Sequence, residues 1–177
     1  RPSMMETGLD VIAHNINRKN NRLQFFEFGK TYSTGGVADY AEQNHLSLYI
    51  TGNIAETGWQ QKPARADFFY LKGVVEKLLA LCGNTQPAYE KEVQPGFDEC
   101  IAIKIKNRTI GYAGKINAKK AAAQDVKEPV FYADLYWDEL VAIQNEKEGL
   151  AFFSGFANVI NAMRTCPRFI IGRIHGK

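Results

Sequence analysis

The sequence has 177 residues, of which 45% are hydrophobic and 23% are charged, with 22 basic against 19 acidic residues and a formal net charge of +3. This length and composition predict one folded domain with a sizeable core and exclude a disordered chain. They also exclude a strongly basic nucleic-acid-binding domain, and no apolar run approaches the roughly 20 residues needed to cross a membrane.

The first predicted element is an amphipathic helix. Ser3 and Glu6 have the spacing of a capping box, in which each side chain binds a backbone N–H at the start of the helix. The polar run 15–21 carries basic residues that suit the negative end of the helix dipole, and it ends the helix. Apolar residues recur on one face at Met5, Leu9, Ile12, Ala13 and Ile16, and Met4 and Val11 widen this stripe.

Two strands are predicted next, with a loop between them. Residues 23–28 are rich in aromatic side chains and indicate an interior strand with apolar residues on both faces. Residues 33–42 contain Gly35-Gly36 and few apolar anchors, so we expect a mobile loop there. Residues 45–51 alternate and predict a half-buried strand, with one face made of Leu46, Leu48 and Ile50.

A second helix is predicted after an irregular connection over residues 52–66. Asp67 is expected to cap its first turn, and Gly83-Asn84 to end it. Its apolar face is predicted to consist of Phe68, Leu71, Val75, Leu78, Leu79 and Cys82.

Strands dominate the second half of the chain. Residues 101–105 alternate, and Asn107-Arg108 is the predicted turn of a hairpin whose second strand is 110–116. Successive strands joined by a hairpin and flanked by helices favour an α+β fold with an antiparallel β-sheet over a doubly wound parallel sheet. The remaining predicted elements are a surface helix over 117–124, a strand over 129–136 and a last short helix from 137.

The reactive residues do not form a catalytic pattern. The sequence has no glycine-rich phosphate loop, no GxSxG nucleophile motif and no HExxH metal motif. Asp134, Asp138 and Glu139 are interpreted as solvated charges and helix caps, because no histidine or basic partner accompanies them in the sequence. From the residues alone we therefore predict a soluble domain without catalytic, cofactor-binding or metal-binding residues. Free thiols are expected for the separated cysteines Cys82, Cys100 and Cys166.

One region concentrates basic side chains and leaves two interpretations open. It could form an RNA-binding patch, or it could be a solvated sheet edge on which lysines block unwanted strand pairing. The RNA interpretation is the weaker one, because Tyr112 is the lone interleaved aromatic residue. The basic residues concerned are Lys104, Lys106, Arg108, Lys115, Lys119 and Lys120.

Several ordered segments resemble the beta subunit of bacterial phenylalanine–tRNA ligases, over roughly residues 1–145. An R-P-S segment leads into a helix that ends in N-x-N-R, and the next strand is similar to the pattern L-x-x-F-E-[IF]-G-[KR]. The matching segments are 1–9, 12–18, 23–32, 46–52, 67–73, 110–116 and 130–135.

The resemblance implies a core like that of class II aminoacyl-tRNA synthetases, in a module that has lost its active-site residues. It further implies that the alpha subunit performs the aminoacylation with ATP and magnesium, in the cytoplasm. The implied partners are the alpha subunit, a second alpha–beta pair of a heterotetramer, and tRNA through the assembled ligase, with no membrane. Two alternatives stay open: a free-standing class II-like paralogue with its own small-molecule chemistry, and an RNA-binding module.

The first helix and strand correspond to the class II motif that serves subunit assembly. The apolar stripe of the helix is wider than one sheet face requires, so part of it is expected to face a partner subunit, with the rest of the stripe in the core. The alternative is that the whole stripe is internal. The predicted interface residues are Met4, Gly8, Val11, His14 and Asn15.

The resemblance divides the chain into a synthetase-like core domain over 1–150 and a C-terminal segment over 151–177. The segment departs abruptly from the family pattern, which suggests a reading-frame change near Leu150 or a disordered tail. Real divergence is the alternative, in which residues 168–174 could still form a strand.

Overall fold

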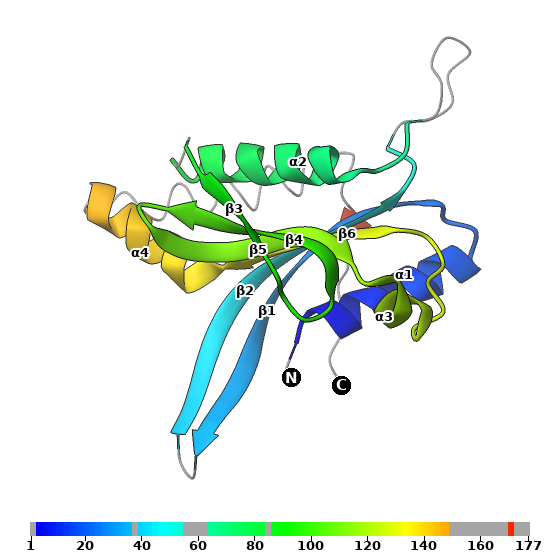
Figure 1. Cartoon of the computed structure of the whole chain (residues 1–177), viewed down its shortest axis with the longest axis horizontal. Helices are drawn as coiled ribbons and strands as arrows, with labels where there is room; N and C mark the ends of the chain where they lie inside the picture. Colours follow the sequence, from blue (N-terminus) through cyan, green and yellow to red (C-terminus); the bar gives the residue numbers. More distant parts are fainter. Residues whose placement is uncertain (1–2, 37–38, 55–63, 84–85, 149–169, 172–177) are drawn as a thin grey trace.

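The computed structural model describes residues 3–36, 39–54, 64–83, 86–148 and 170–171. These residues form one seven-stranded sheet with helices on both faces (Figure 1), in the strand order β3-β4-β5-β6-β2-β1-β7. Neighbouring strands are antiparallel except for β1 and β7, so the predicted α+β fold with an antiparallel sheet is confirmed. The elements are α1 (Met5–Asn17), β1 (Arg22–Gly36), β2 (Asp39–Gly52), α2 (Phe68–Leu81), β3 (Ala88–Glu92), β4 (Phe97–Ile105), β5 (Arg108–Ile116), α3 (Ala118–Ala122), β6 (Val130–Tyr136), α4 (Trp137–Glu148) and β7 (Ile170–Ile171).

Two hydrophobic clusters lie on opposite faces of this sheet. One contains buried residues of α2 and α4, and the other contains buried residues of α1 and α3. Figure 1 shows α1 and α2 on opposite sides of the strands. No helix among the described residues is long and apolar enough to cross a bilayer.

Strand β2 lies between the two clusters and contributes to both. Leu46, Leu48 and Ile50 belong to the α2 cluster, as their alternation predicts, and Tyr49 belongs to the α1 cluster. The prediction of a half-buried strand was wrong, because α1 covers the second face and leaves Tyr49 and Ser47 fully buried as well.

The predicted loop over residues 33–42 is also corrected. Most of it continues β1 and β2 as a long antiparallel hairpin that projects beyond the rest of the sheet (Figure 1). Backbone pairing continues past Thr34, through a register shift, to Gly36 with Asp39, and an ion pair between Lys30 and Glu42 joins the two strands. Cross-strand hydrogen bonding thus extends the strands where the sequence offers few apolar anchors.

Helix α1 begins at Met5, and its apolar stripe packs as predicted, although the capping box does not form as expected. The N-cap residue is Met4, without a side-chain cap. The hydroxyl of Ser3 accepts a hydrogen bond from the Met5 N–H at 3.1 Å, and Glu6 pairs with Lys120 of α3 at 2.5 Å. The carboxylate of Glu6 therefore joins two helices on the same face of the sheet.

Gly8 lies where α1 crosses the sheet most closely. An added Cβ would be 1.9 Å from Cε1 of Tyr49, so the aromatic ring occupies the space that a side chain would need. Tyr49 also donates its phenolic hydrogen to the carbonyl oxygen of Met4 at 2.7 Å. One tyrosine thus fixes both the distance of the helix from the sheet and the position of its first turn.

The other predicted helices and strands are confirmed with shifts of a few residues, whereas most of the predicted irregular connection over residues 52–66 lies outside the described residues. Asp67 caps α2 by accepting a hydrogen bond from the Tyr70 N–H at 2.7 Å, and Gly83 follows the helix with a φ of 74°. The β4–β5 turn consists of Lys106 and Asn107 and so begins one residue earlier than predicted. Both residues have positive φ angles, as a two-residue hairpin turn requires. The short strand β3 was not predicted.

The division into residues 1–150 and 151–177 stays a prediction. Nearly all of the second segment lies outside the described residues. Ile170 and Ile171, within the range predicted as a possible strand, pair in parallel with Phe25 and Phe26.

The contact at Gly8 leads to a prediction about stability. We expect Gly8→Ala to lower the free energy of unfolding by about 1–3 kcal/mol, because the methyl group must displace the Tyr49 ring from a packed core. The matched control is Gly73→Ala in α2, where nothing lies within 4 Å of an added Cβ. There the better helix propensity of alanine should stabilise the protein by up to about 1 kcal/mol. Urea unfolding measures both, and equal effects of the two substitutions would refute the close-packing account.

Candidate functional site

A polar cavity of about 290 Å³ lies on the face of the sheet that carries α1. Strands β1, β2, β5 and β6 form its floor, and the start of α1 and the β3–β4 turn form its sides. The lining residues are Ser3, Met4, Met5, Thr31, Gln43, His45, Gln94, Pro95, Phe97, Tyr112, Tyr132, Asp134 and Tyr136.

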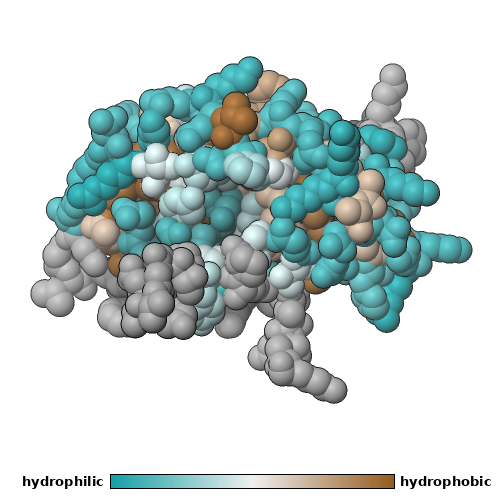
Figure 2. Space-filling view, turned by 60° about the horizontal axis from the view of Figure 1, so that its bottom comes forward, coloured by the Kyte–Doolittle hydropathy of each residue, from teal (hydrophilic) through white to brown (hydrophobic). Residues whose placement is uncertain are grey.

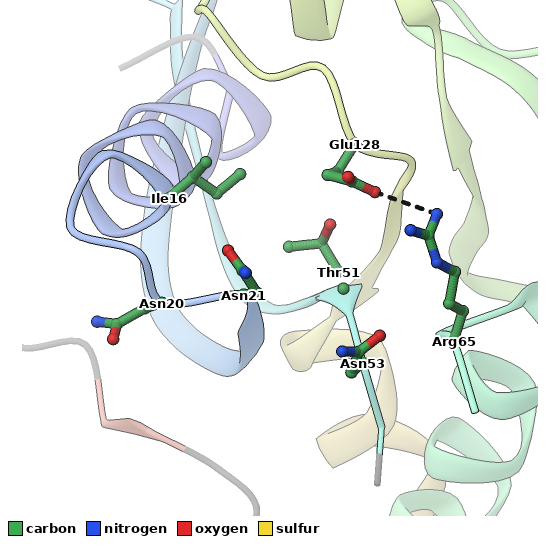
Figure 3. A pocket seen from close by; sticks show the side chains of 8 residues that line it. Ile16, Asn20, Asn21, Thr51, Asn53, Arg65 and Glu128 are labelled. Carbon is green, nitrogen blue, oxygen red and sulfur yellow. Dashed lines mark ion pairs between the residues drawn. The ribbon is translucent and has the colours of Figure 1, made fainter. Parts of the chain in front are cut away.

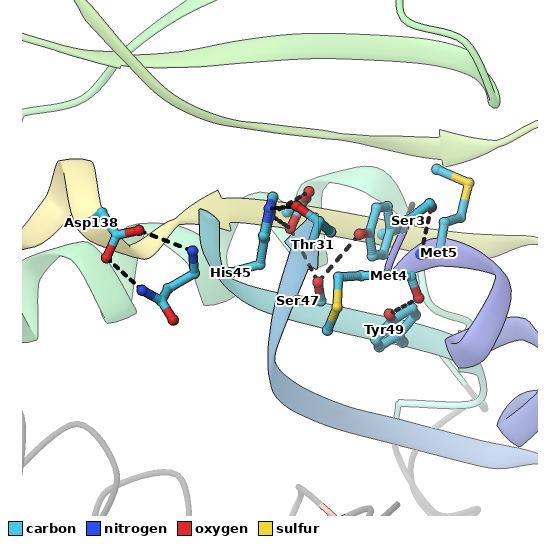
Figure 4. Close-up of polar contacts among 11 residues, drawn as sticks. Ser3, Met4, Met5, Thr31, His45, Ser47, Tyr49 and Asp138 are labelled. Atoms are coloured by element: carbon cyan, nitrogen blue, oxygen red, sulfur yellow. Dashed lines mark hydrogen bonds and ion pairs between the residues drawn. The ribbon is translucent and has the colours of Figure 1, made fainter. Parts of the chain in front are cut away.

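A chain of hydrogen bonds crosses the floor of this cavity (Figure 4). Nδ1 of His45 lies 3.0 Å from both carboxylate oxygens of Asp134, and Nε2 lies 2.7 Å from the hydroxyl oxygen of Thr31. Ser47 donates its hydroxyl hydrogen to Asp134 at 3.1 Å. Since that hydrogen is used, Ser47 accepts the hydrogen bond from Tyr132, 3.2 Å away. The pairing of β2 with β6 places these side chains together.

The carboxylate of Asp134 determines how the His45 ring is held. A carboxylate beside Nδ1 favours a proton on that nitrogen, and in the neutral ring Nε2 then accepts from the Thr31 hydroxyl. His45 is 5% exposed and Asp134 is 20% exposed, so the carboxylate is the part of the pair that faces the cavity.

The start of α1 closes one side of the cavity. The Met4 carbonyl is fixed by Tyr49, and Met5 packs on the β3–β4 turn, where an added Cβ at Gly96 would lie 3.1 Å from the Met5 sulfur. The position of the cavity wall therefore depends on the same contacts that seat the helix.

Three tyrosine side chains in the cavity wall are neutral at ordinary pH. Burial raises the pKa of Tyr132 well above its usual value, and it also raises the pKa values of Tyr112 and Tyr136. All three phenols therefore stay protonated and act as neutral hydrogen-bonding groups.

The cavity does not suit ATP or magnesium. None of the described residues that line it is Lys or Arg, so these residues offer no cation to balance phosphate charges. Among the residues that the structure describes, no group of three or more His, Cys, Asp or Glu could hold a metal ion. The donor set of the cavity thus fits neither group.

The cysteines do not supply a nucleophile within the described residues. In the described part of the chain, Cys82 and Cys100 are thiols outside any disulfide, as predicted, and both are buried. Burial raises the pKa of each thiol to about 11, and Glu92 adds to the effect at Cys100. Cys166 lies outside the described residues.

The five residues predicted at a subunit interface occupy different environments. Met4 is 1% exposed, and Gly8 accommodates the Tyr49 ring within the domain, so neither reaches the surface of this chain. Val11 is half-buried beside the α1 cluster, and His14 is exposed. Asn15 donates to the Val11 carbonyl at 2.8 Å, which fixes its side chain on the helix. The interface assignment itself stays a prediction.

Sequence reasoning missed the pair formed by His45 and Asp134. The interpretation of Asp134 as a carboxylate without a histidine partner was wrong, because 89 residues separate the two in sequence and the sheet alone brings them together. Asp138 does not cap a helix either: it accepts hydrogen bonds from the backbone and side-chain nitrogens of Asn44, at 2.9 and 2.8 Å. Alternation within 45–51 could have indicated which face His45 occupies, although not its partner.

The basic region is largely ion-paired. Lys104 pairs with Glu90, and both Lys106 and Arg108 pair with Glu146 of α4. The interpretation as a sheet edge was wrong, since β4 and β5 are interior strands and β3 lies outside them.

A second cavity, of about 170 Å³, lies where α1 leads into β1 (Figure 3). Arg65, which lines this cavity, lies 3.6 Å from Glu128, and both are well exposed. Asn53 donates its backbone N–H to the Asn21 carbonyl at 3.1 Å, so these asparagines join the segments that flank β1 and β2. This arrangement supports a structural role.

Comparison with known proteins identifies relatives for most of the chain. A family model described as the phenylalanyl tRNA synthetase beta chain CLM domain matches residues 1–137. The phenylalanine–tRNA ligase beta subunit of Bacteroides fragilis is 32% identical over 171 residues, which cover 90% of this chain and 21% of that protein. That of Listeria innocua is 34% identical over 134 residues, covering 72% of this chain and 16% of that protein. The chain therefore spans about a fifth of the length of these relatives.

Solved structures show where the same fold occurs. Pyrrolysyl-tRNA synthetase from Desulfitobacterium hafniense is similar with a TM-score of 0.63 at 13% identity, covering 88% of this chain and 56% of that one. A second structure of that organism's enzyme is similar with a TM-score of 0.61 at 14% identity, covering 82% of this chain and 50% of that one. The expected fold of a class II aminoacyl-tRNA synthetase is thereby confirmed.

The hydrogen bond from Tyr49 to Met4 should contribute measurably to stability. We expect Tyr49→Phe to lower the free energy of unfolding by about 1–1.5 kcal/mol, because the buried Met4 carbonyl loses the shorter of its two hydrogen bonds and keeps the one from the Gly8 N–H at 3.3 Å. The matched control is Tyr89→Phe, which removes an exposed hydroxyl that bonds Glu76 at 3.2 Å and should change stability by no more than about 0.5 kcal/mol. Chemical denaturation measures both, and a Tyr49→Phe protein as stable as the control would contradict the assignment.

Proposed function

The chain belongs to the phenylalanyl-tRNA synthetase beta chain CLM domain family, and from this membership we propose that it is the catalytically silent, assembly-supporting module of a phenylalanine–tRNA ligase beta subunit. The assembled ligase attaches phenylalanine to its tRNA with ATP and magnesium, in the cytoplasm. Its partners in this proposal are the alpha subunit, which performs the chemistry, and a second alpha–beta pair. Contact with tRNA is made through the whole ligase.

The composition of the cavity on the sheet carries the proposal of catalytic silence. Activation of an amino acid by ATP requires cationic groups on the phosphates, and among the described residues that line the cavity none is Lys or Arg. Asp134, the carboxylate among these described lining residues, is already engaged by His45 and Ser47. The class II-like sheet therefore carries a cavity whose described lining residues have charges that oppose the binding of a nucleotide.

This account makes a direct prediction about activity. We expect the purified chain to show phenylalanine-dependent ATP–pyrophosphate exchange at the level of a protein-free blank, because it cannot bind the triphosphate productively. The assembled ligase serves as the positive control in the same assay. Exchange well above the blank, which disappears on Asp134→Asn, would overturn the proposal and favour a paralogue with its own chemistry.

The outer surface of α1 supports the proposed role in assembly. Its inner face is occupied by the sheet, which leaves half-buried Val11 and exposed His14 at the boundary between the core and the surface. On the face of the molecule seen in Figure 2, hydrophobic residues form small separate areas among hydrophilic ones. An interface on such a surface would combine single apolar side chains with polar contacts, as non-obligate interfaces do.

A pair of matched substitutions tests the assembly surface. In the full beta subunit, Val11→Glu should weaken the association with the alpha subunit by at least about tenfold, because it places a charge at the centre of the proposed contact. Val74→Glu in α2 makes the same change at a position that is also partly buried, on the opposite face of the sheet. We expect this control to leave the association unchanged.

Binding of the alpha subunit is measured by titration with each folded variant, after circular dichroism has compared their helix content. Unchanged affinity in folded Val11→Glu would exclude Val11 from the interface. Unfolding by Val11→Glu but not by Val74→Glu would instead support an apolar stripe that is internal throughout.

A further inference from the structure

The carboxylate of Asp134 has unused hydrogen-bonding capacity on the side that faces the cavity. It accepts hydrogen bonds from His45 and Ser47, whereas an ionised carboxylate has about four lone-pair sites. The side chain of Asp134 is 20% exposed, and it lines the cavity. The cavity thus presents a partly satisfied anion in a concave, largely neutral wall.

Aromatic rings surround this carboxylate. Tyr136 lies edge-on to the ring of His45 at 5.6 Å between centroids, and Tyr112 lies edge-on to Tyr136 at 6.0 Å. Phe97 stacks on Tyr132 at 5.8 Å on the other side of the cavity. The apolar carbons of these rings accommodate an organic group.

The surrounding charge favours a cation as well. Burial is the main cause of the raised pKa values of Tyr112 and Tyr136, and the negative charge of Glu92 adds to both. Lys104 also lies near Tyr112, but its ammonium group pairs with Glu90 at 2.5 Å. Phosphates and carboxylates would therefore meet unfavourable charge in this cavity.

We propose that the cavity binds a small organic amine, with the ammonium group on Asp134 and the apolar body against the tyrosine and phenylalanine rings. This binding function is separate from the assembly role of the module, because the cavity lies between the start of α1 and the sheet and not on the outer surface of α1. The ammonium group supplies the hydrogen-bond donors that the free lone pairs of Asp134 can accept, and the neutral phenols supply further polar contacts.

Three probes of similar size and different charge test the chemistry. Benzylammonium, benzyl alcohol and benzoate are titrated into the full chain at neutral pH, and binding is followed by the chemical shifts of the tyrosine rings. We expect benzylammonium to bind at least tenfold more tightly than benzyl alcohol, and benzoate to bind least. Equal binding of the three probes, or no binding of benzylammonium at millimolar concentration, would overturn the proposal.

The role of Asp134 is tested by a charge-matched pair of variants. Asp134→Asn should weaken benzylammonium binding at least tenfold and leave benzyl alcohol binding unchanged. Asp138→Asn removes the same charge from a residue that bonds Asn44 and does not line the cavity, so it should leave both affinities unchanged. Equal losses in the two variants would show that the attraction is general and not due to a site at Asp134.

A third variant covers the case in which Asp134→Asn fails to fold. Gln43 lines the cavity and is half-buried, so Gln43→Trp fills part of the cavity without touching the hydrogen-bond network of His45. We expect this variant to lose benzylammonium binding while it keeps the wild-type unfolding midpoint. Wild-type affinity in folded Gln43→Trp would place the amine elsewhere and end the proposal.

Discussion

The contact between Tyr49 and the first two turns of α1 is the constraint on which the rest of the structure depends. The ring fills the space beneath Gly8, and the hydroxyl donates to the Met4 carbonyl at 2.7 Å. A larger residue at position 8 would lift the helix from the sheet, and loss of the hydroxyl would release its first turn. Because Met4 and Met5 also form a side of the polar cavity, this contact sets the shape of the cavity as well as the packing of the core.

Strand β2 connects this constraint to the chemistry of the site. One of its faces contributes leucine and isoleucine side chains to the α2 cluster, and the other carries His45, Ser47 and Tyr49 in succession. Both faces of β2 are buried, and a buried polar side chain without a hydrogen-bond partner would destabilise the fold. The hydrogen bond between His45 and Asp134 is therefore kept. The same strand therefore supports the hydrophobic core and the polar floor of the cavity.

The fold and the charges of the cavity point to different conclusions about function. The fold is that of class II aminoacyl-tRNA synthetases, and family membership places the chain in a ligase beta subunit. Among the described residues, the lining of the cavity on its sheet contains no Lys or Arg, and it offers the Asp134 carboxylate among aromatic rings. The fold alone therefore does not establish what this site does, because function depends on the site and not on the architecture.

The sequence by itself determined the local elements and the fold class. The apolar stripe of α1, the capping of α2 by Asp67 and the alternation of β2 were readable because each depends on neighbours within a few residues. The hairpin beyond Thr31 was not readable, since its strands are joined by backbone hydrogen bonds that leave no pattern in the side chains. The pairing of His45 with Asp134, the meeting of Gly8 with Tyr49 and the burial of both faces of β2 were decided by the tertiary structure alone, because each brings together residues that are far apart in the chain and that the sequence does not connect.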